Sequence, residues 1–209
     1  GDIAKEKAGI IKKCDNEGVT ITIPQNTEVM SVLEKRAIEC DNKFIVAKVP
    51  NVHEFSGSYE IFDYDGIFNI KMQMLGEHQS QNASLAIEAA RLLGILQDNI
   101  KEGILKARNI GRFEIISKEP LILFDGAHNK NGMGSLAKGI NRCFGEHKKS
   151  FIMACMRDKE IEEAVLELKK YGYDKDSSFY TVSVVDNPRS EDANTLSKRL
   201  MKTGILSTP

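Results

Sequence analysis

Apolar and polar positions follow two different rhythms along this chain. Near its start, Val19–Ile23 is a β-branched run bounded by Gly18 and Pro24, which predicts a strand. Apolar residues then recur at helical spacing as far as Ala37, and Phe44–Ala47 predicts the next strand. A strand, a helix and a strand within about thirty residues are typical of a βαβ unit, so we expect a parallel sheet here.

The next segment predicts a hairpin followed by two helices. Residues 59–74 alternate around Asp65-Gly66, a dipeptide favoured in hairpin turns, and we expect an antiparallel addition to the sheet there. Residues 78–94 predict a helix that ends at Gly94, and a second helix is expected over about 98–108. The apolar face of the first helix is expected to carry Leu85, Ala86, Ala89, Leu92 and Leu93.

The pattern breaks near residues 109–111, which predicts a boundary between domains 1–109 and 110–209. Beyond it, strands and helices alternate regularly, which predicts a doubly wound α/β domain with its ligand site beyond the carboxyl ends of the strands. The expected strands are Phe113–Ile116, Leu121–Phe124, Phe151–Met156 and Phe179–Val185. The expected apolar helix positions are Met133, Leu136, Ile140 and Phe144, then Ile161, Ala164, Val165 and Leu168, and finally Ala193, Leu196 and Leu200.

Composition excludes several classes of partner. The 209 residues are 41% hydrophobic and 28% charged with a formal net charge of -1, so nothing indicates a nucleic-acid or membrane-surface partner. No apolar stretch approaches the ~20 residues of a membrane span, and no signal peptide is recognisable. The four cysteines show no CxxC or metal-site spacing, which predicts buried, reduced thiols and a cytoplasmic location.

Three residues near the expected boundary are candidates for chemistry. Asp125 follows an apolar strand and precedes Gly126, where an open sheet holds its ligand, so it could bind a ribose hydroxyl or a metal-bound water. A turn or N-cap role is the alternative for Asp125, and a satisfied turn histidine is the alternative for His128. Arg112 could bind a phosphate with its planar fork, or form a structural ion pair with Glu114.

Further candidates lie on a helix and on two strand ends. Asn82, in the first turns of a helix, could read the edge of an adenine or act as a cap. Arg189, in a rigid Asn-Pro-Arg turn, could bind the carboxylate of an amino-acid substrate or simply be exposed. Asp158 and Lys159 could line the site or start a helix. The chain has no G-x-x-x-x-G-K-[ST] phosphate loop, which argues against a self-sufficient NTPase.

Five segments together carry a family resemblance. "IAKEKAGIIK", "GEHQSQNA", "GRFEII", "LFDGAHN" and "RDKE" occur in the order and spacing of the folylpolyglutamate synthase family, including its dihydrofolate synthase forms, within the Mur ligase superfamily. The resemblance runs from Gly1 to about Asn194. It implies the rear part of a Mur-ligase-type ATPase domain followed by a Rossmann-like C-terminal domain. The family's phosphate loop and closing strands are not in this sequence, and we expect a chain cut at both ends.

The resemblance also implies a reaction and its participants. It implies ATP-dependent ligation of L-glutamate to a folate through an acyl phosphate, by a monomeric enzyme that uses Mg²⁺. The implied roles are a carbamylated, Mg²⁺-bridging lysine at Lys7, an adenine contact at Asn82, ATP contacts at Arg112 and Asp125, and assistance near the phosphates from His128.

Two departures keep other functions open. Lys130 stands where the family usually has Pro, and "DNPRSED" resembles the turn that binds the added amino acid in muramoyl-tripeptide ligases. A cell-wall peptide ligase is therefore an alternative, as is a nucleotide- or amino-acid-binding module without catalysis. The 209 residues alone are expected not to hydrolyse ATP. Dihydropteroate and tetrahydrofolate remain alternative acceptors.

Overall fold

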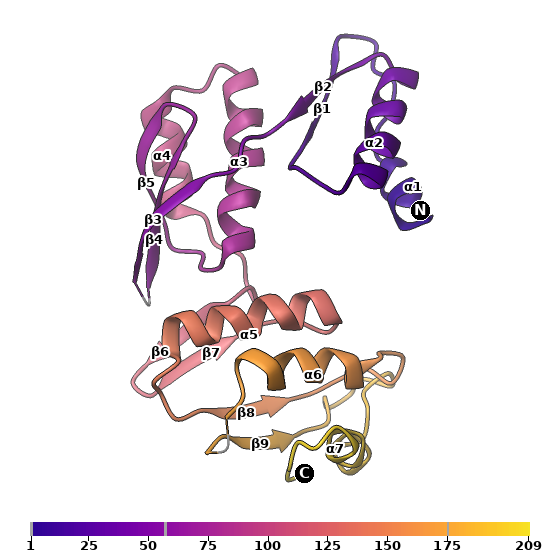
Figure 1. Ribbon diagram of the computed structural model, residues 1–209, viewed down its shortest axis with the longest axis vertical. Helices are drawn as coiled ribbons and strands as arrows, with labels where there is room; N and C mark the ends of the chain where they lie inside the picture. Colours follow the sequence, from indigo (N-terminus) through magenta and orange to yellow (C-terminus); the bar gives the residue numbers. More distant parts are fainter. Residues whose placement is uncertain (1, 57, 175) are drawn as a thin grey trace. The chain divides into compact units, whose positions relative to one another are not determined.

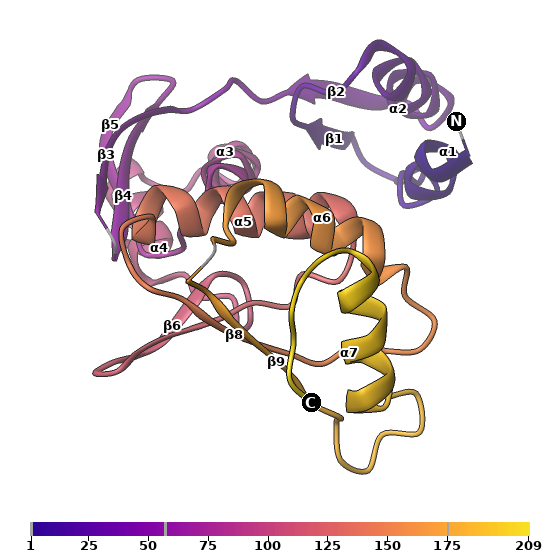
Figure 2. The ribbon, with the colours of Figure 1, turned by 60° about the horizontal axis from the view of Figure 1, so that its bottom comes forward.

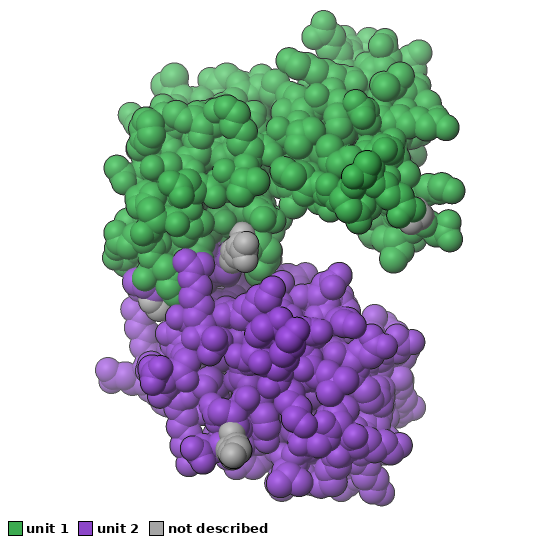
Figure 3. Space-filling model, viewed as in Figure 1, with its two compact units in different colours: residues 1–55, 59–73, 78–107 green, residues 56–58, 74–77, 108–209 purple. Residues whose placement is uncertain are grey.

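The computed structural model describes residues 2–56, 58–174 and 176–209, so Gly1 lies outside it. These residues form two compact units (Figure 3). The first unit lies within 1–55, 59–73 and 78–107, and the second comprises 56–58, 74–77 and 108–209. In the described residues, no helix is long and apolar enough to cross a membrane.

The first unit contains nine helices and strands in its described part. These are α1 (Asp2–Ala8), β1 (Gly18–Thr22), α2 (Thr27–Glu39), β2 (Asn42–Val46), β3 (Asn51–Ser56), β4 (Tyr59–Tyr64), β5 (Ile67–Met72), α3 (Glu77–Leu92) and α4 (Gln97–Lys106) (Figure 1). Strands β1 and β2 are parallel and joined through α2, which confirms the expected βαβ unit. Helix α2 begins where Asn26 Oδ1 accepts the Val29 N–H at 2.9 Å.

The expected hairpin forms, but in a sheet of its own. Strands β4 and β5 pair antiparallel around Asp65 (φ 41°) and Gly66 (φ 84°), and β3 lies on the other side of β4. The expectation that this hairpin extends the β1–β2 sheet is therefore wrong. Asp65 stabilises the turn by accepting hydrogen bonds from Arg91, at 2.9 Å, and from Lys48. Both bonds tie a local turn to residues elsewhere in the unit.

Helix α3 has the expected length but buries a different face. Gly94 (φ 71°) follows its end as expected, whereas Leu92 and Leu93 are 46% and 78% exposed. The buried row runs through Gln79, Ala83 and Ile87 at four-residue spacing. Small polar side chains share this face: the buried Ser84 hydroxyl, for example, donates to the Gln81 carbonyl at 2.7 Å. Hydrophobicity alone therefore misplaces the core face.

The second unit alternates strands and helices as expected. Its elements are β6 (Glu114–Lys118), β7 (Leu121–Phe124), α5 (Lys130–Phe144), β8 (Ser150–Met153), α6 (Ile161–Tyr171), β9 (Ser178–Thr181) and α7 (Ala193–Lys202). Strands β6 and β7 are antiparallel, β8 and β9 are parallel, and α5 packs against α6 on one side of the strands (Figures 1 and 2). Strands β8 and β9 end earlier than expected, because the residues after Met153 and Thr181 leave the ladder and form long loops.

The core of the second unit confirms the apolar periodicity of its helices. Phe151 of β8 stacks on Phe179 of β9 with ring centroids 5.5 Å apart. The expected helix positions that are fully buried include Met133 on α5, Ile161, Ala164, Val165 and Leu168 on α6, and Leu196 and Leu200 on α7. The cysteine expectation is only partly correct: all four thiols are free, but Cys14 is exposed and Cys143 half-buried.

Lys149 caps the carboxyl end of α5. Its ammonium donates to the Gly145 and His147 carbonyls at 3.1 and 3.0 Å and to Asp174 at 2.8 Å, and its side chain is 11% exposed. We expect Lys149→Met to lower the free energy of unfolding by about 1–2 kcal/mol, because the Gly145 carbonyl at the helix end and the His147 carbonyl just beyond it lose a charged donor. Urea unfolding measures the loss, and the exposed neighbour Lys148→Met is the matched control. Equal unfolding midpoints for the two variants would contradict this role.

Candidate functional site

The loop after β7 is tied to the residues before β6 by the Asp125 carboxylate. Oδ2 accepts the Phe113 N–H and Oδ1 accepts the Ala127 N–H, both at 2.7 Å. A main-chain bond from Gly126 to the Gly111 carbonyl, at 2.8 Å, reinforces this contact. Of the two roles that the sequence leaves open for Asp125, the structure shows the turn role. Each carboxylate oxygen keeps a second lone pair for a ligand.

His128 and Arg112 are exposed beside this loop. The His128 Nδ1 lies 2.9 Å from the Gly126 carbonyl, which can only accept, so the proton lies on Nδ1. Its Nε2 has no hydrogen-bond partner among residues 2–56, 58–174 and 176–209. The Arg112 guanidinium has no ion-pair partner within the described parts of the chain. Glu114, its expected structural partner, instead accepts the Gly111 N–H at 2.9 Å. Both side chains therefore offer hydrogen-bonding groups to a ligand.

Two further loops follow β8 and β9 in the same unit. The β8–α6 loop (154–160) carries Asp158, and the β9–α7 loop (182–192) carries Arg189. Both Asp158 oxygens lie 2.9 Å from Nη2 of Arg189, which holds the pKa of Asp158 below its usual value. The other Arg189 donors, on Nε and Nη1, have no partner among the residues the structure describes, so they are open to a carboxylate.

Main-chain hydrogen bonds join these two loops to each other. The Glu191 N–H donates to the Cys155 carbonyl at 2.8 Å, and the Arg157 N–H donates to the Arg189 carbonyl at 2.9 Å. The Arg157 side chain also donates to the Ser190 carbonyl at 2.9 Å. The loops therefore behave as one hydrogen-bonded segment, which we name the paired loops. Elsewhere in the same unit, Nζ of Lys130, at the start of α5, lies 3.7 Å from Oε2 of Glu163 in the first turn of α6.

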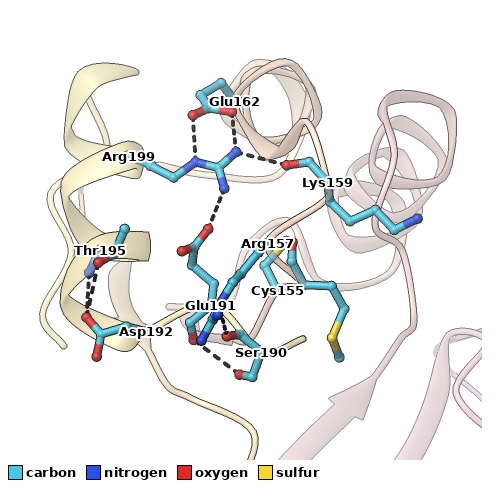
Figure 4. Close-up of polar contacts among 10 residues, drawn as sticks. Cys155, Arg157, Lys159, Glu162, Ser190, Glu191, Asp192, Thr195 and Arg199 are labelled. Carbon is cyan, nitrogen blue, oxygen red and sulfur yellow. Dashed lines mark hydrogen bonds and ion pairs between the residues drawn. The ribbon is translucent and has the colours of Figure 1, made fainter. Parts of the chain in front are cut away.

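A partly buried arginine that the sequence reasoning missed connects the paired loops to two helices. Arg199 of α7 donates to both Glu162 oxygens at 2.7 and 2.8 Å, to Glu191 at 2.7 Å and to the Lys159 carbonyl at 2.9 Å (Figure 4). Its side chain is 19% exposed, and that of Glu191 is 11% exposed. Neither sequence spacing nor a motif identifies this cluster, because Glu162 lies 37 residues away from Arg199.

The Glu162–Arg199 pair predicts a specific loss of stability in acid. Hydrogen bonds from Arg199 lower the pKa of Glu162 from 4.5 to about 2. Because the folded-state pKa is the lower one, the contribution is complete above the unfolded-state pKa and is lost as pH falls toward about 2. Glu162 is 41% exposed, so we discount the contribution for solvent screening to about 1 kcal/mol.

Urea unfolding between about pH 5 and about pH 2.5 measures this effect. Glu162→Gln should show a weaker decline in stability than the wild type, since an amide does not titrate in this range. Glu163→Gln, at the exposed neighbouring position, is the matched control. Identical declines for wild type and Glu162→Gln would show that the pair does not contribute.

The first unit holds the remaining two candidates. Lys7 lies in the last turn of α1 and is exposed, because Ala4 and Ala8 provide the buried face of this helix. Asn82 is exposed on α3, and its Nδ2 lies 3.4 Å from Gln79 Oε1. The structure thus brings Asp125 and His128 together in one loop and joins Arg189 to Asp158, while Lys7 and Asn82 lie in the other unit.

Most of the second unit is similar to a known family of protein domains. Residues 111–207 match the family "Mur ligase, glutamate ligase domain". The chain is 29% identical over 181 residues to the dihydrofolate synthase/folylpolyglutamate synthase of Bacillus subtilis, covering 80% of this chain and 41% of that protein. It is 27% identical over 203 residues to the folylpolyglutamate synthase of Lacticaseibacillus casei, covering 90% and 45%.

Solved structures show the same fold over nearly the whole chain. The folylpolyglutamate synthase of Thermotoga maritima matches with a TM-score of 0.80 at 27% identity, covering 99% of this chain and 49% of that one. A Mycobacterium tuberculosis folylpolyglutamate synthase complexed with ADP matches with a TM-score of 0.83 at 21% identity, covering 99% and 48%. The chain thus spans about half the length of these relatives. Residues 111–207 are thus similar to the glutamate ligase domain of the Mur ligases, and the chain as a whole is similar to folylpolyglutamate and dihydrofolate synthases.

Proposed function

We propose that this chain is part of an ATP-dependent ligase that joins L-glutamate to a folate. In this proposal, residues 1–109 form the C-terminal portion of the ATP-binding domain, and residues 110–209 form a truncated Mur-ligase C-terminal domain. The observation that carries the proposal is the second unit itself. Its residues 111–207 match the glutamate ligase domain of the Mur ligases, and its strand-end loops present exposed groups suited to phosphate and carboxylate ligands.

The groups on these loops suit the two halves of an amide ligation. In the first half, an oxygen of the folate carboxylate attacks the γ-phosphorus of ATP, and ADP leaves. In the second half, the amine of glutamate attacks the acyl carbon, phosphate leaves and the amine loses a proton. Arg112 stabilises the phosphoryl oxygens, and Arg189 binds a carboxylate of glutamate. His128 assists as the imidazolium, whose Nε2 donates to a phosphoryl oxygen while Nδ1 donates to the Gly126 carbonyl. Asn82 contacts the adenine, and Asp125 shapes its loop and accepts a ribose hydroxyl.

The surroundings of Lys7 meet the needs of a metal-binding carbamate only in part. Its exposed amine has room to add CO₂ and so become a carboxylate, an oxygen ligand that suits Mg²⁺. The described residues contain no group of three or more His, Cys, Asp or Glu that could hold a metal ion. The proposal therefore places only the Lys7 carbamate next to Mg²⁺. Bound Mg²⁺ would neutralise charge on the phosphates.

The decisive experiment follows ADP release by the complete reading frame that encodes this chain. Mg-ATP and glutamate are supplied with dihydropteroate, with tetrahydrofolate or with a UDP-muramoyl peptide. Release that requires a pterin substrate supports the proposal and identifies the acceptor. Release only with the muramoyl peptide assigns the chain to a cell-wall ligase, and no release with any acceptor favours a binding module. The 209 residues alone should release no ADP. Mg²⁺-dependent ADP release by them would contradict the prediction that they are inactive without the rest of the protein.

Arg112→Ala tests the proposed phosphate contact. In the complete enzyme, we expect turnover to fall about 100-fold, since a guanidinium that stabilises a transferring phosphoryl group is removed. Arg112 is exposed and makes no ion pair with described residues, so its loss should leave the unfolding midpoint unchanged. Lys148→Met controls for the loss of a surface cation. Unchanged turnover in Arg112→Ala would remove this residue from the mechanism.

A further inference from the structure

The position of Arg189 depends on contacts that lie outside its own turn. The Asp158 contact is weak as an anchor, because the side chains of Arg189 and Asp158 are 65% and 53% exposed. The main-chain bonds of the paired loops hold the Arg189 backbone beside the β8–α6 loop. These bonds join the two loops to each other but do not attach them to a helix. The Asp192 cap attaches the β9–α7 loop to α7, since its Oδ1 accepts the Thr195 N–H at 3.0 Å. A further side chain contacts both loops and α6 together.

Arg199 provides this attachment from two directions. Through Glu191 it holds the β9–α7 loop two residues beyond Arg189, and through the Lys159 carbonyl it holds the β8–α6 loop one residue beyond Asp158. Its remaining bonds go to Glu162 on α6. A planar guanidinium has donors in fixed directions, so one side chain sets three partners at once.

The contact between Arg199 and Glu191 has no substitute among the described residues. It is nearly buried, and Arg199 is the one cation within ion-pair distance of it in the part of the chain that the structure describes. A carboxylate in this position is strongly disfavoured without its partner. Loss of Arg199 therefore drives Glu191 toward solvent, and the β9–α7 loop moves with it.

We propose that Arg199 is a positioning residue that sets where the paired loops present Arg189 to the carboxylate of the incoming amino acid. This rests on the proposed function, because it takes Arg189 as the group that binds glutamate. Small displacements of a substrate-binding group have large effects on binding and rate. The role is specific: a change at Arg199 should affect the amino-acid substrate far more than ATP.

Steady-state kinetics of the complete enzyme tests the proposal with three variants. Arg199→Lys keeps the positive charge but loses the planar guanidinium that bonds to three partners. We expect it to raise the KM for glutamate about tenfold while the KM for ATP stays within about twofold. Glu191→Gln keeps an oxygen that accepts from Nη1, so its KM for glutamate should stay within about threefold of the wild type. Lys149→Met, which destabilises the same unit elsewhere, should leave both constants within about twofold.

Hydrogen exchange on the 209-residue chain gives a readout that needs no activity. In Arg199→Lys, the Glu191 and Arg157 amides, which bond across the paired loops, should exchange faster than in Lys149→Met. Equal exchange in both variants, or KM values for ATP and glutamate that rise together, would overturn the positioning role. A wild-type enzyme with no glutamate-dependent ADP release would instead overturn the proposed function, and the exchange result would still decide the role of Arg199.

Discussion

Replacing Asp125 with Ala is expected to lower the free energy of unfolding by about 2–4 kcal/mol, since two hydrogen bonds to an ionised acceptor are lost. The Phe113 and Ala127 N–H groups, both 2.7 Å from the carboxylate, would lose their partner. Phe113 has φ 49° and is 3% exposed, so a strained and buried segment loses its restraint. In the complete enzyme, turnover should fall about 100-fold, because the loop after β7, which carries His128, loses its conformation.

Urea unfolding of the 209-residue chain measures the stability change, and hydrogen exchange at Phe113 and Ala127 locates it. Asp125→Asn should lose about half as much stability, since its amide offers one acceptor to two donors. Asp176→Ala is the matched control, because this exposed aspartate contributes only its main-chain N–H to a described hydrogen bond. Full protection of both amides in Asp125→Ala would show that the carboxylate does not hold the loop.

Replacing Arg199 with Met is expected to lower the free energy of unfolding by about 3 kcal/mol, because one partner of a largely desolvated ion pair is removed. Four hydrogen bonds are lost, and the nearly buried Glu191 is left with an uncompensated charge. This penalty is larger than the Coulomb attraction alone would suggest, since it includes the desolvation of the remaining carboxylate.

A double variant separates these two causes. Arg199→Met combined with Glu191→Met removes both charges, so part of the lost stability should return. Lys198→Met, at the exposed neighbouring position of α7, should change the free energy of unfolding by less than about 0.5 kcal/mol. A double variant that is less stable than the sum of the two single variants would show that the desolvated carboxylate is not the main cost.

Local signals predicted most of the elements in both units. The β-branched run around Ile21 and the Asp65-Gly66 turn are confirmed as β1 and the β4–β5 hairpin. Helix faces were predicted correctly where the buried row is apolar, as on α6. They were predicted wrongly on α3, where Ser80 and Ser84 share the buried face. A pattern of apolar residues does not identify a serine as buried when its hydroxyl is hydrogen-bonded within its own helix.

The candidate site was predicted as a set of residues but not as a set of contacts. Asp125 and Arg189 were identified because each follows a strand, which is a local property of the sequence. The partners of these residues were not predicted: Phe113 lies 12 residues from Asp125, and Asp158 lies 31 residues from Arg189. Arg199 was missed altogether, since an arginine on an amphipathic helix looks like any solvated cation until its neighbours are known.

The sequence by itself determined the order of helices and strands, the turns and the family resemblance, because each depends on residues within a few positions of one another. Only the tertiary structure decided which polar groups are used internally and which remain open. The carboxylates of Asp125 and Glu191 are engaged by donors from other elements, whereas Arg112 and His128 keep exposed nitrogen atoms. The physical reason is burial: a charge taken out of water needs a partner, and the fold decides which distant residue supplies it.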